Sequence, residues 1–291
     1  MNKQEILNKL FSGDKKLPTL PVIFDKLNQM LRDATASNKQ IADLMMKDQS
    51  MVIKVLKLCN SAMFGTRKEI TNLANAITFL GIERIKTLVL QVSLVKTFNI
   101  EDGDIPEFSI NTFWEHSLGT AFYTNIIIKK LHLQPDDNYY IAGLLHDVGK
   151  LVIYQFYPQK FKEIIKLQVK NNLIDYQAEE QILGVNHHEI GGFLAEQWNF
   201  NKEIIEAIRE HHTSDSQQNL LVSIVQIANL FAKAAGLCFP WDNKFFEIMG
   251  APTWEVIANH AKNLDTDSLV TDLMNETQTV KDGVRELLSK P

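Results

Sequence analysis

Apolar residues recur at helical spacing along almost the whole chain. A short amphipathic segment covers residues 6–11, and a second helix opens at Pro21, because proline suits the first position of a helix. Ser37 is placed to cap a further helix over residues 38–47. The alternation typical of strands is nowhere convincing. The pattern therefore predicts an all-α protein.

The helical pattern breaks at residues 101–109 (EDGDIPEFS), where turn-forming residues gather. We therefore expect a two-lobed helical fold, with an N-terminal lobe over residues 1–108 and a second lobe over residues 109–291. In the second lobe the apolar spacing predicts helices over residues 113–131, 138–155, 161–171, 176–183, 188–198, 202–211, 220–235, 253–263 and 268–289.

The composition is that of an ordinary globular protein. The chain has 291 residues, of which 45% are hydrophobic, and this is enough to bury a sizeable core. A net charge of −5 argues against a large nucleic-acid-binding surface. The two cysteines, Cys59 and Cys238, are far apart, which disfavours both a disulfide framework and a CxxC zinc site.

Nothing in the sequence predicts a membrane segment. The N-terminal stretch MNKQEILNKLFSGDKK has no apolar signal core. No stretch approaches the roughly 18 uncharged apolar residues that a membrane-spanning helix needs. We therefore expect a cytoplasmic protein without membrane association.

The clearest chemical signal is the adjacent pair His146–Asp147 in the apolar stretch AGLLHDVGKLVIY. An aspartate in such a helix should be paired or metal-bound, because an isolated buried charge is very costly. Histidine supplies a neutral nitrogen, and aspartate supplies an anionic oxygen that can bridge two cations. Lys150 lies four residues after His146, on the same helical face, and could reach a phosphate oxygen. Taken alone, the pair is also consistent with a local hydrogen-bonded polar contact.

Further histidines lie near predicted helix ends. His116, in FWEHSLGTAF, would on its own be a histidine on a helix surface. His187 follows Asn186, a candidate N-cap, where a solvated first turn is the alternative. His211 and His212 close a helix, where a favourable interaction with the helix dipole is a competing explanation.

Taken together, these segments resemble the HD superfamily of metal-dependent phosphohydrolases. The family pattern is a first histidine, a His-Asp pair, further histidines and a final aspartate on a late helix. In this chain Asn229 stands at the last position, within LLVSIVQIANLFAKAAG, and its alternative role is a buried asparagine that hydrogen-bonds another helix. The resemblance implies these metal ligands: His116, His146, Asp147, His187, His211, His212 and Asn229.

The first lobe narrows the resemblance to the HDOD domain, an HD-related output domain of bacterial signalling proteins. The start LPTLPVIFDKLNQML, the pair Asn60-Ser61 and the run Ile77–Gly81 carry it there. The segments GLLHDVGK and GVNHHEIGGFLAEQW continue it. The likeness extends from about Leu17 to Ala235.

The resemblance implies one or two divalent transition-metal ions, because mixed imidazole and carboxylate ligands suit iron, manganese, zinc or nickel. Asp147 would be shared between the two ions. In a catalytic member of the superfamily, Asp147 and Lys150 would act on the substrate, with Lys150 steadying a phosphate. One ion would be held by His116, His146, Asp147 and Asn229. The other would be held by Asp147, His187, His211 and His212.

Two departures from the superfamily pattern bear on activity. Asn229 offers a neutral carbonyl where an aspartate is expected, so one anionic ligand is lost. The Gly-Tyr-Pro motif of the HD-GYP enzymes is missing, because the chain after His187-His188-Glu189 reads IGGFLAEQ. Hydrolysis of cyclic di-GMP is therefore not supported.

These features favour a bacterial signal-transduction protein whose HD site binds metal without catalysis, since many HDOD domains are thought to have lost turnover. The alternative is a metal-dependent phosphohydrolase acting on a nucleotide or another phosphoester. A third reading is a scaffold without metal. In the signalling reading the partners are other proteins, and a homodimer is compatible with the pattern. The role of residues 238–291 stays open.

Overall fold

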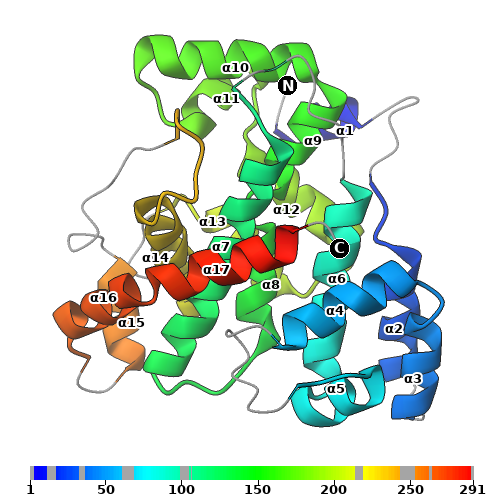
Figure 1. The fold of residues 1–291 in the computed structure, drawn as a ribbon. Coiled ribbons are helices and arrows are strands. Elements are labelled where there is room, and N and C mark those ends of the chain that lie inside the picture. The colour runs from blue at the N-terminus through cyan, green and yellow to red at the C-terminus, as the bar shows by residue number, and fades with distance from the viewer. Residues whose placement is uncertain are drawn as a thin grey trace. The chain divides into compact units, whose positions relative to one another are not determined.

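The computed structural model describes residues 3–11, 18–32, 37–60, 69–98, 105, 107–213, 219–242, 253–261 and 264–289. Across these ranges the regular structure is α-helical throughout and contains no strand (Figure 1). The all-α prediction is therefore confirmed. In the same ranges no helix is long and apolar enough to cross a lipid bilayer.

The chain folds into two compact units, and each is discontinuous in sequence. The larger unit comprises residues 1–17 and 100–277, and the smaller comprises residues 18–99 and 278–291. The sequence predicted two consecutive lobes divided after residue 108, so the structure differs from that division at both ends of the chain. Within the predicted boundary segment, residues 101–104 and 106 lie outside the described residues.

The first helix, α1 (Lys3–Leu10), belongs to the larger unit because its contacts are made there. Nζ of Lys3 lies 2.6 Å from the carboxylate of Glu180. The ring of Phe11, directly after the helix, stacks on Phe193 with centroids 5.5 Å apart. An N-terminal segment that reads as part of the first lobe is thus held by side chains far along the chain.

The smaller unit packs its helices around one apolar core that includes Leu27, Met45 and Val55. Leu287 of the last helix packs against this core, which explains why the end of the chain belongs here. The prediction that Ser37 is an N-cap is confirmed by a capping box with Gln40. The helices are α2 (Val22–Arg32), α3 (Asn38–Met45), α4 (Gln49–Asn60), α5 (Leu73–Leu80), α6 (Ile82–Thr97) and most of α17 (Thr277–Leu288).

The side chain of Asn60, at the end of α4, makes three hydrogen bonds to backbone groups. Its amide nitrogen donates to the carbonyl oxygens of Leu56 and Ile70, each at 2.9 Å. Its amide oxygen accepts from the backbone N–H of Ile70 at 2.7 Å. Asn60 therefore fixes the end of α4 to the segment that precedes α5.

We expect Asn60→Ala to destabilise the smaller unit by about 1–3 kcal/mol, because it leaves the buried polar backbone of Ile70 without partners. Urea denaturation followed by circular dichroism measures the change. The control is Asn75→Ala, at an exposed position on α5, which should leave stability nearly unchanged. Equal stability of the two variants would contradict the role given to Asn60.

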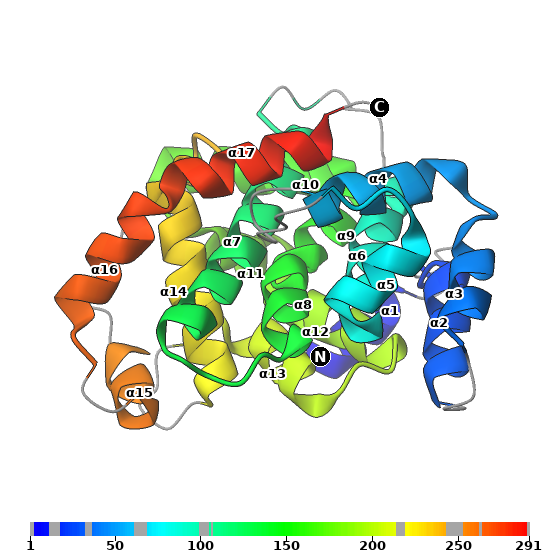
Figure 2. The same cartoon turned by 60° about the horizontal axis from the view of Figure 1, so that its bottom comes forward.

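The larger unit is built around α7, which packs on α8 and α14 and lies between them in Figure 2. A second layer of contacts joins α12 to α9 and α13. The helices are α7 (Ile110–Lys130), α8 (Asp137–Leu145), α9 (Val148–Phe156), α10 (Pro158–Asn171), α11 (Asp175–Leu183), α12 (His187–Gln197), α13 (Lys202–Glu210), α14 (Leu220–Ala234), α15 (Thr253–His260) and α16 (Thr266–Asn275).

Two long helices predicted from the sequence are each divided in the structure. The predicted helix over residues 138–155 stops at Leu145 and resumes at Val148, so His146–Asp147 forms a turn instead of a helical face. The backbone of Asp147 lies at φ −99° and ψ 7°, outside the helical region. The predicted helix over residues 268–289 is likewise interrupted at Glu276. Apolar periodicity continues across both breaks, which is why the sequence did not reveal them.

Candidate metal centre

The larger unit brings six of the predicted ligands together in two groups that share Asp147. In each group, one ligand atom from every residue lies within 4.8 Å of the others. The ligands come from α7, from the turn between α8 and α9, from the first residue of α12 and from the turn after α13. The first group is His116, His146 and Asp147. The second group is Asp147, His187, His211 and His212.

In the first group the two imidazoles and the carboxylate converge. The Nε2 atoms of His116 and His146 lie 3.2 Å apart. Each also lies 3.5 Å from Oδ2 of Asp147. All three side chains are buried. These donor atoms surround a point suited to an ion with nitrogen and oxygen ligands.

In the second group Nε2 of His187 is the central atom. It lies 3.1 Å from Nε2 of His212, 3.3 Å from Nε2 of His211 and 3.2 Å from Oδ1 of Asp147. Nε2 of His211 lies 3.5 Å from the same Oδ1. Asp147 thus turns one oxygen to each group, as a carboxylate that bridges two ions does.

Hydrogen bonds at Nδ1 of the histidine rings determine whether Nε2 carries a proton or a lone pair. Three of the histidines place Nδ1 2.7 or 2.8 Å from a backbone carbonyl oxygen. A carbonyl only accepts, so Nδ1 carries the proton and Nε2 of the neutral ring keeps a lone pair. Crowded lone pairs repel one another unless a cation lies between them. The pairs are His116 with Leu237, His146 with Gly143, and His211 with Ile208.

The protonation states fit this arrangement. Burial lowers the pKa of His116, His146, His211 and His212, which leaves these rings neutral. Burial alone would raise the pKa of Asp147, but the charge of Lys150, together with a hydrogen bond from His187, holds it well below its usual range. These four rings therefore offer neutral nitrogens around the anionic carboxylate of Asp147, the form in which these side chains bind metals.

Glu179 on α11 orients His187. One carboxylate oxygen of Glu179 accepts both from Nδ1 and from the backbone N–H of His187, each at 2.7 Å. Burial opposes a charge on His187, but the carboxylates of Glu179, Asp175 and Asp147 outweigh it and raise the pKa of His187 to about 10. A proton held at this position is released when a metal takes Nε2.

We expect Glu179→Gln to weaken metal binding at the second group about 10-fold, because outer partners of a histidine ligand fix its orientation and raise its basicity. A competition titration with Zn²⁺ measures the affinity. The control is Glu180→Gln, since the neighbouring carboxylate is exposed and pairs with Lys3 instead. Wild-type affinity in Glu179→Gln would show that Glu179 does not support the centre.

Lys150 is buried beside the centre, and three carboxylates lie around its ammonium group. Its Nζ lies 2.6 Å from Asp175, 2.9 Å from Asp147 and 3.6 Å from Asp242. Asp242 in turn lies 2.9 Å from Nζ of Lys233. Burial opposes the charge of Lys150, but these carboxylates raise its pKa well above the ordinary value. In this arrangement Lys150 neutralises buried acids, whereas the sequence pointed to a role in holding a phosphate.

The buried charges do not balance without a cation. Four carboxylates, of Asp147, Asp175, Glu179 and Asp242, face two ammonium groups, of Lys150 and Lys233, which leaves a charge of −2. A proton on His187 offsets part of it. Unpaired buried charge is costly, so a divalent cation among the ligands would remove the imbalance. The donor set and the charge both fit a metal ion.

Asn229 is buried on α14, the helix that packs along α7. Its Oδ1 has no hydrogen-bond partner in the described part of the chain. A buried amide oxygen normally has a partner, so this atom is compatible with a weak ligand or with a contact to a bound molecule.

Sequence reasoning missed the supporting residues of the centre. Asp175 and Glu179 read as ordinary acids of a helical surface, and Asp242 lies outside the segments that resemble a known family. Only the fold brings these three carboxylates against His187 and Lys150. No pattern in the sequence signals such contacts, because the partners lie on different helices.

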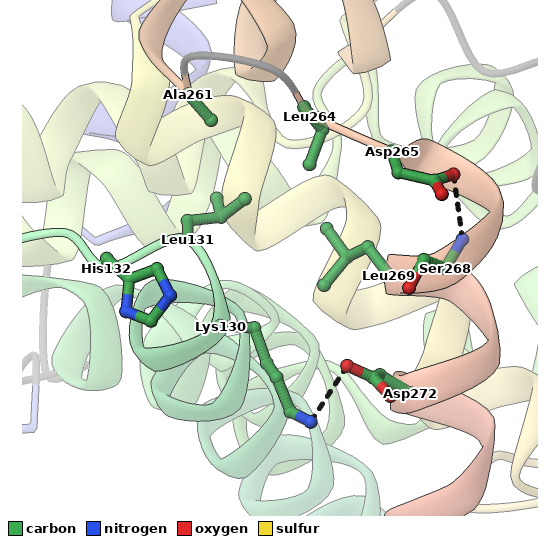
Figure 3. Close-up of a pocket in the computed structure, with 9 residues that line it drawn as sticks. All are labelled: Lys130, Leu131, His132, Ala261, Leu264, Asp265, Ser268, Leu269 and Asp272. Carbon is green, nitrogen blue, oxygen red and sulfur yellow. Dashed lines mark hydrogen bonds and ion pairs between the residues drawn. The ribbon is translucent and has the colours of Figure 1, made fainter.

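A separate pocket of about 240 Å³ lies at the other end of α7, between its last turn and α16. Figure 3 shows Lys130 and His132 on one side and Asp265, Ser268 and Asp272 on the other. Nζ of Lys130 pairs with Asp272 at 2.9 Å. At a helical rise of 1.5 Å per residue, this pocket is about 20 Å along α7 from His116. It is therefore distinct from the candidate metal centre.

The chain matches a known family over most of its length. The family model of the HDOD domain matches residues 17–214. This chain belongs to the HDOD domain family. Its fold is similar to the crystal structure of an HDOD domain protein of unknown function from Geobacter sulfurreducens, with 27% identity, 98% of both chains covered and a TM-score of 0.85.

Two further proteins resemble this HDOD chain. A candidate signal transduction protein from Marinobacter aquaeolei VT8 shares the fold, with a TM-score of 0.74, 18% identity, and coverage of 98% of this chain and 66% of that one. An uncharacterized protein of Treponema pallidum (strain Nichols) is 26% identical over 218 residues, which are 74% of this chain and 42% of that protein. The chain thus spans less than half the length of this relative.

Proposed function

We propose that this HDOD protein is a regulatory component of bacterial signal transduction, and that its HD centre binds a divalent transition metal for structure and not for turnover. In this proposal it acts in the cytoplasm through protein partners. The observation that carries it is Lys150, which is buried and held by Asp147 and Asp175, so that its charge serves these carboxylates and not a substrate phosphate.

Two further observations support a structural metal. The ligand side chains are almost entirely buried, and the most accessible of them, His212, is 12% exposed. Asn229 gives the centre one anionic ligand fewer than the superfamily pattern. The name of the similar Marinobacter aquaeolei protein, a candidate in signal transduction, agrees with this role. Iron, manganese, zinc and nickel all suit these ligands.

The second candidate function is a metal-dependent phosphohydrolase acting on a nucleotide or another phosphoester. The observation that favours it is the position of Asp147, with one oxygen directed at each group of histidines. Two ions bound in this way supply Lewis acidity to a phosphoester. His188 and His212 would then line the approach to the centre, since they are its partly exposed histidines in the described part of the chain.

One experiment separates the two candidates. Untagged protein is stripped of metal and reconstituted with Fe²⁺ under anaerobic conditions, or with Mn²⁺, Zn²⁺ or Ni²⁺. Each form is tested on a chromogenic phosphodiester and on nucleotides. The regulatory proposal predicts that metal restores thermal stability and that turnover never exceeds that of Asp147→Ala. Metal-dependent turnover that Asp147→Ala abolishes would establish the phosphohydrolase instead.

A further inference from the structure

The segment Leu237–Asp242 lies beyond the HDOD family match, which ends at residue 214. It follows α14 directly. Two of its residues, Leu237 and Asp242, lie against side chains of the candidate metal centre. The carbonyl oxygen of Leu237 lies 2.7 Å from Nδ1 of His116, and the carboxylate of Asp242 lies between Lys233 and Lys150.

The contact with Leu237 sets His116 apart from the other ligands. His146 and His211 bond to carbonyls three residues earlier in their own turns, so local backbone fixes their rings. His116 depends on a carbonyl that is 121 residues away in the sequence. Its tautomer and orientation therefore depend on how the segment Leu237–Asp242 is held in place.

Asp242 is the ionic anchor of that segment. Its Oδ1 lies 2.9 Å from Nζ of Lys233, and its Oδ2 lies 3.6 Å from Nζ of Lys150. All three side chains are buried. Buried ions are stable only when they are paired, so these two lysines hold the carboxylate in one place.

Aromatic contacts hold the rest of the segment. The ring of Phe239 lies 5.1 Å from Phe108 and 4.8 Å from Trp241, nearly parallel to the latter. The indole N–H of Trp241 donates to the carbonyl of Glu107 at 2.8 Å. The segment is thus fixed at several points, and Asp242 is the one that also touches the lysine beside Asp147.

We propose that Asp242 is a positioning residue for the first group of ligands. By joining Lys233 to Lys150, it fixes the segment Leu237–Asp242 and so holds the Leu237 carbonyl against His116. The second group does not depend on it, because Glu179 and the turn after α13 orient those histidines. This inference rests on the proposed metal binding.

The test is a Co²⁺ titration of the metal-free full chain, followed by visible absorption. The variants His116→Ala and His212→Ala assign binding steps to the first and second groups. We expect Asp242→Asn to weaken the step that His116→Ala abolishes by about 10–100-fold, the usual effect of losing an outer partner of a metal ligand. The step that His212→Ala abolishes should keep its wild-type affinity.

The control is Asp272→Asn, which removes a carboxylate at the same 2.9 Å distance from a lysine, but on the surface. It should bind Co²⁺ as the wild type does. If Asp242→Asn does not fold, the double variant Lys233→Gln/Asp242→Asn removes both ions of the pair and tests the same prediction. As a second readout, the ¹⁵N shifts of His116 should report loss of its fixed Nδ1–H tautomer in either variant.

The outcomes are distinguishable. If the wild type binds no Co²⁺, the proposed metal centre itself fails. If the wild type binds and Asp242→Asn matches it at every step, the centre stands and the role of Asp242 is overturned. A wild type with no step sensitive to His116→Ala also overturns it, because the first group would then hold no ion.

Discussion

Asp147→Ala should remove metal from both groups of ligands at once and lower the melting temperature of the larger unit. The reason is that Asp147 is the shared ligand, with Oδ2 facing His116 and His146 and Oδ1 facing His187. It is also a buried partner of Lys150. Breaking a buried ion pair costs about 3–5 kcal/mol, which corresponds to roughly 10 °C or more in a chain of this size.

Elemental analysis and differential scanning calorimetry measure the two effects on the same sample. The matched control is Asp272→Ala, which also removes a carboxylate 2.9 Å from a lysine, at a site where both side chains are about one-third exposed or more. An exposed pair contributes about 0–1 kcal/mol, so this control should keep its metal and most of its stability. Metal content and melting temperature that stay unchanged in Asp147→Ala would refute the shared-ligand arrangement.

Gly149→Ala should damage the centre without touching any ligand atom. Gly149 is the second residue of α9, and a Cβ added there would lie 1.9 Å from the carbonyl oxygen of His187. The carbonyl is part of the backbone of α12 and cannot rotate aside, so α9 and α12 must separate to relieve the overlap. Overpacking of a core costs about 1–3 kcal/mol, and a clash of this depth belongs at or above that range. We also expect weaker metal binding, since His187 moves with α12.

Gly192→Ala is the control for this prediction. The three atoms nearest to a Cβ at Gly192 all belong to the side chain of Arg209, a partly exposed residue that can move aside. Alanine also favours a helix by about 1 kcal/mol over glycine, so the variant should be close to the wild type. Thermal melts measure the stability of both variants, and Zn²⁺ titrations measure their metal affinity. A Gly149→Ala protein with wild-type stability and affinity would show that α9 and α12 are not packed this closely.

The features that could be predicted from the sequence are those that depend on residues close to one another in the chain. The N-cap Ser37 is recognisable because its partner Gln40 lies within one turn, and Asn186 with Glu189 caps α12 in the same way. The pair His146–Asp147 stands out because apolar residues flank it on both sides. Such signals concern local backbone and burial, and they are enough to place His187 at the start of a helix.

Features that depend on distant contacts could not be predicted. The break between α8 and α9 leaves no trace in the apolar pattern, although it turns Asp147 towards both groups of histidines. The network of Lys150, Lys233 and Asp242 joins segments that are far apart in sequence. The assignment of α1 to the larger unit and of most of α17 to the smaller unit likewise follows from packing alone. Helical periodicity specifies which face is buried, but not the partner that buries it.

The central claim is that the groups sharing Asp147 bind a transition metal, and the most direct test is elemental analysis of protein purified without a histidine tag. Inductively coupled plasma mass spectrometry on freshly purified protein, before and after dialysis against a chelator, gives the stoichiometry. We expect at least one transition-metal ion per chain, whose removal lowers the melting temperature and whose return restores it. Protein that contains no stoichiometric metal, takes up none on reconstitution and melts at the same temperature throughout would contradict it.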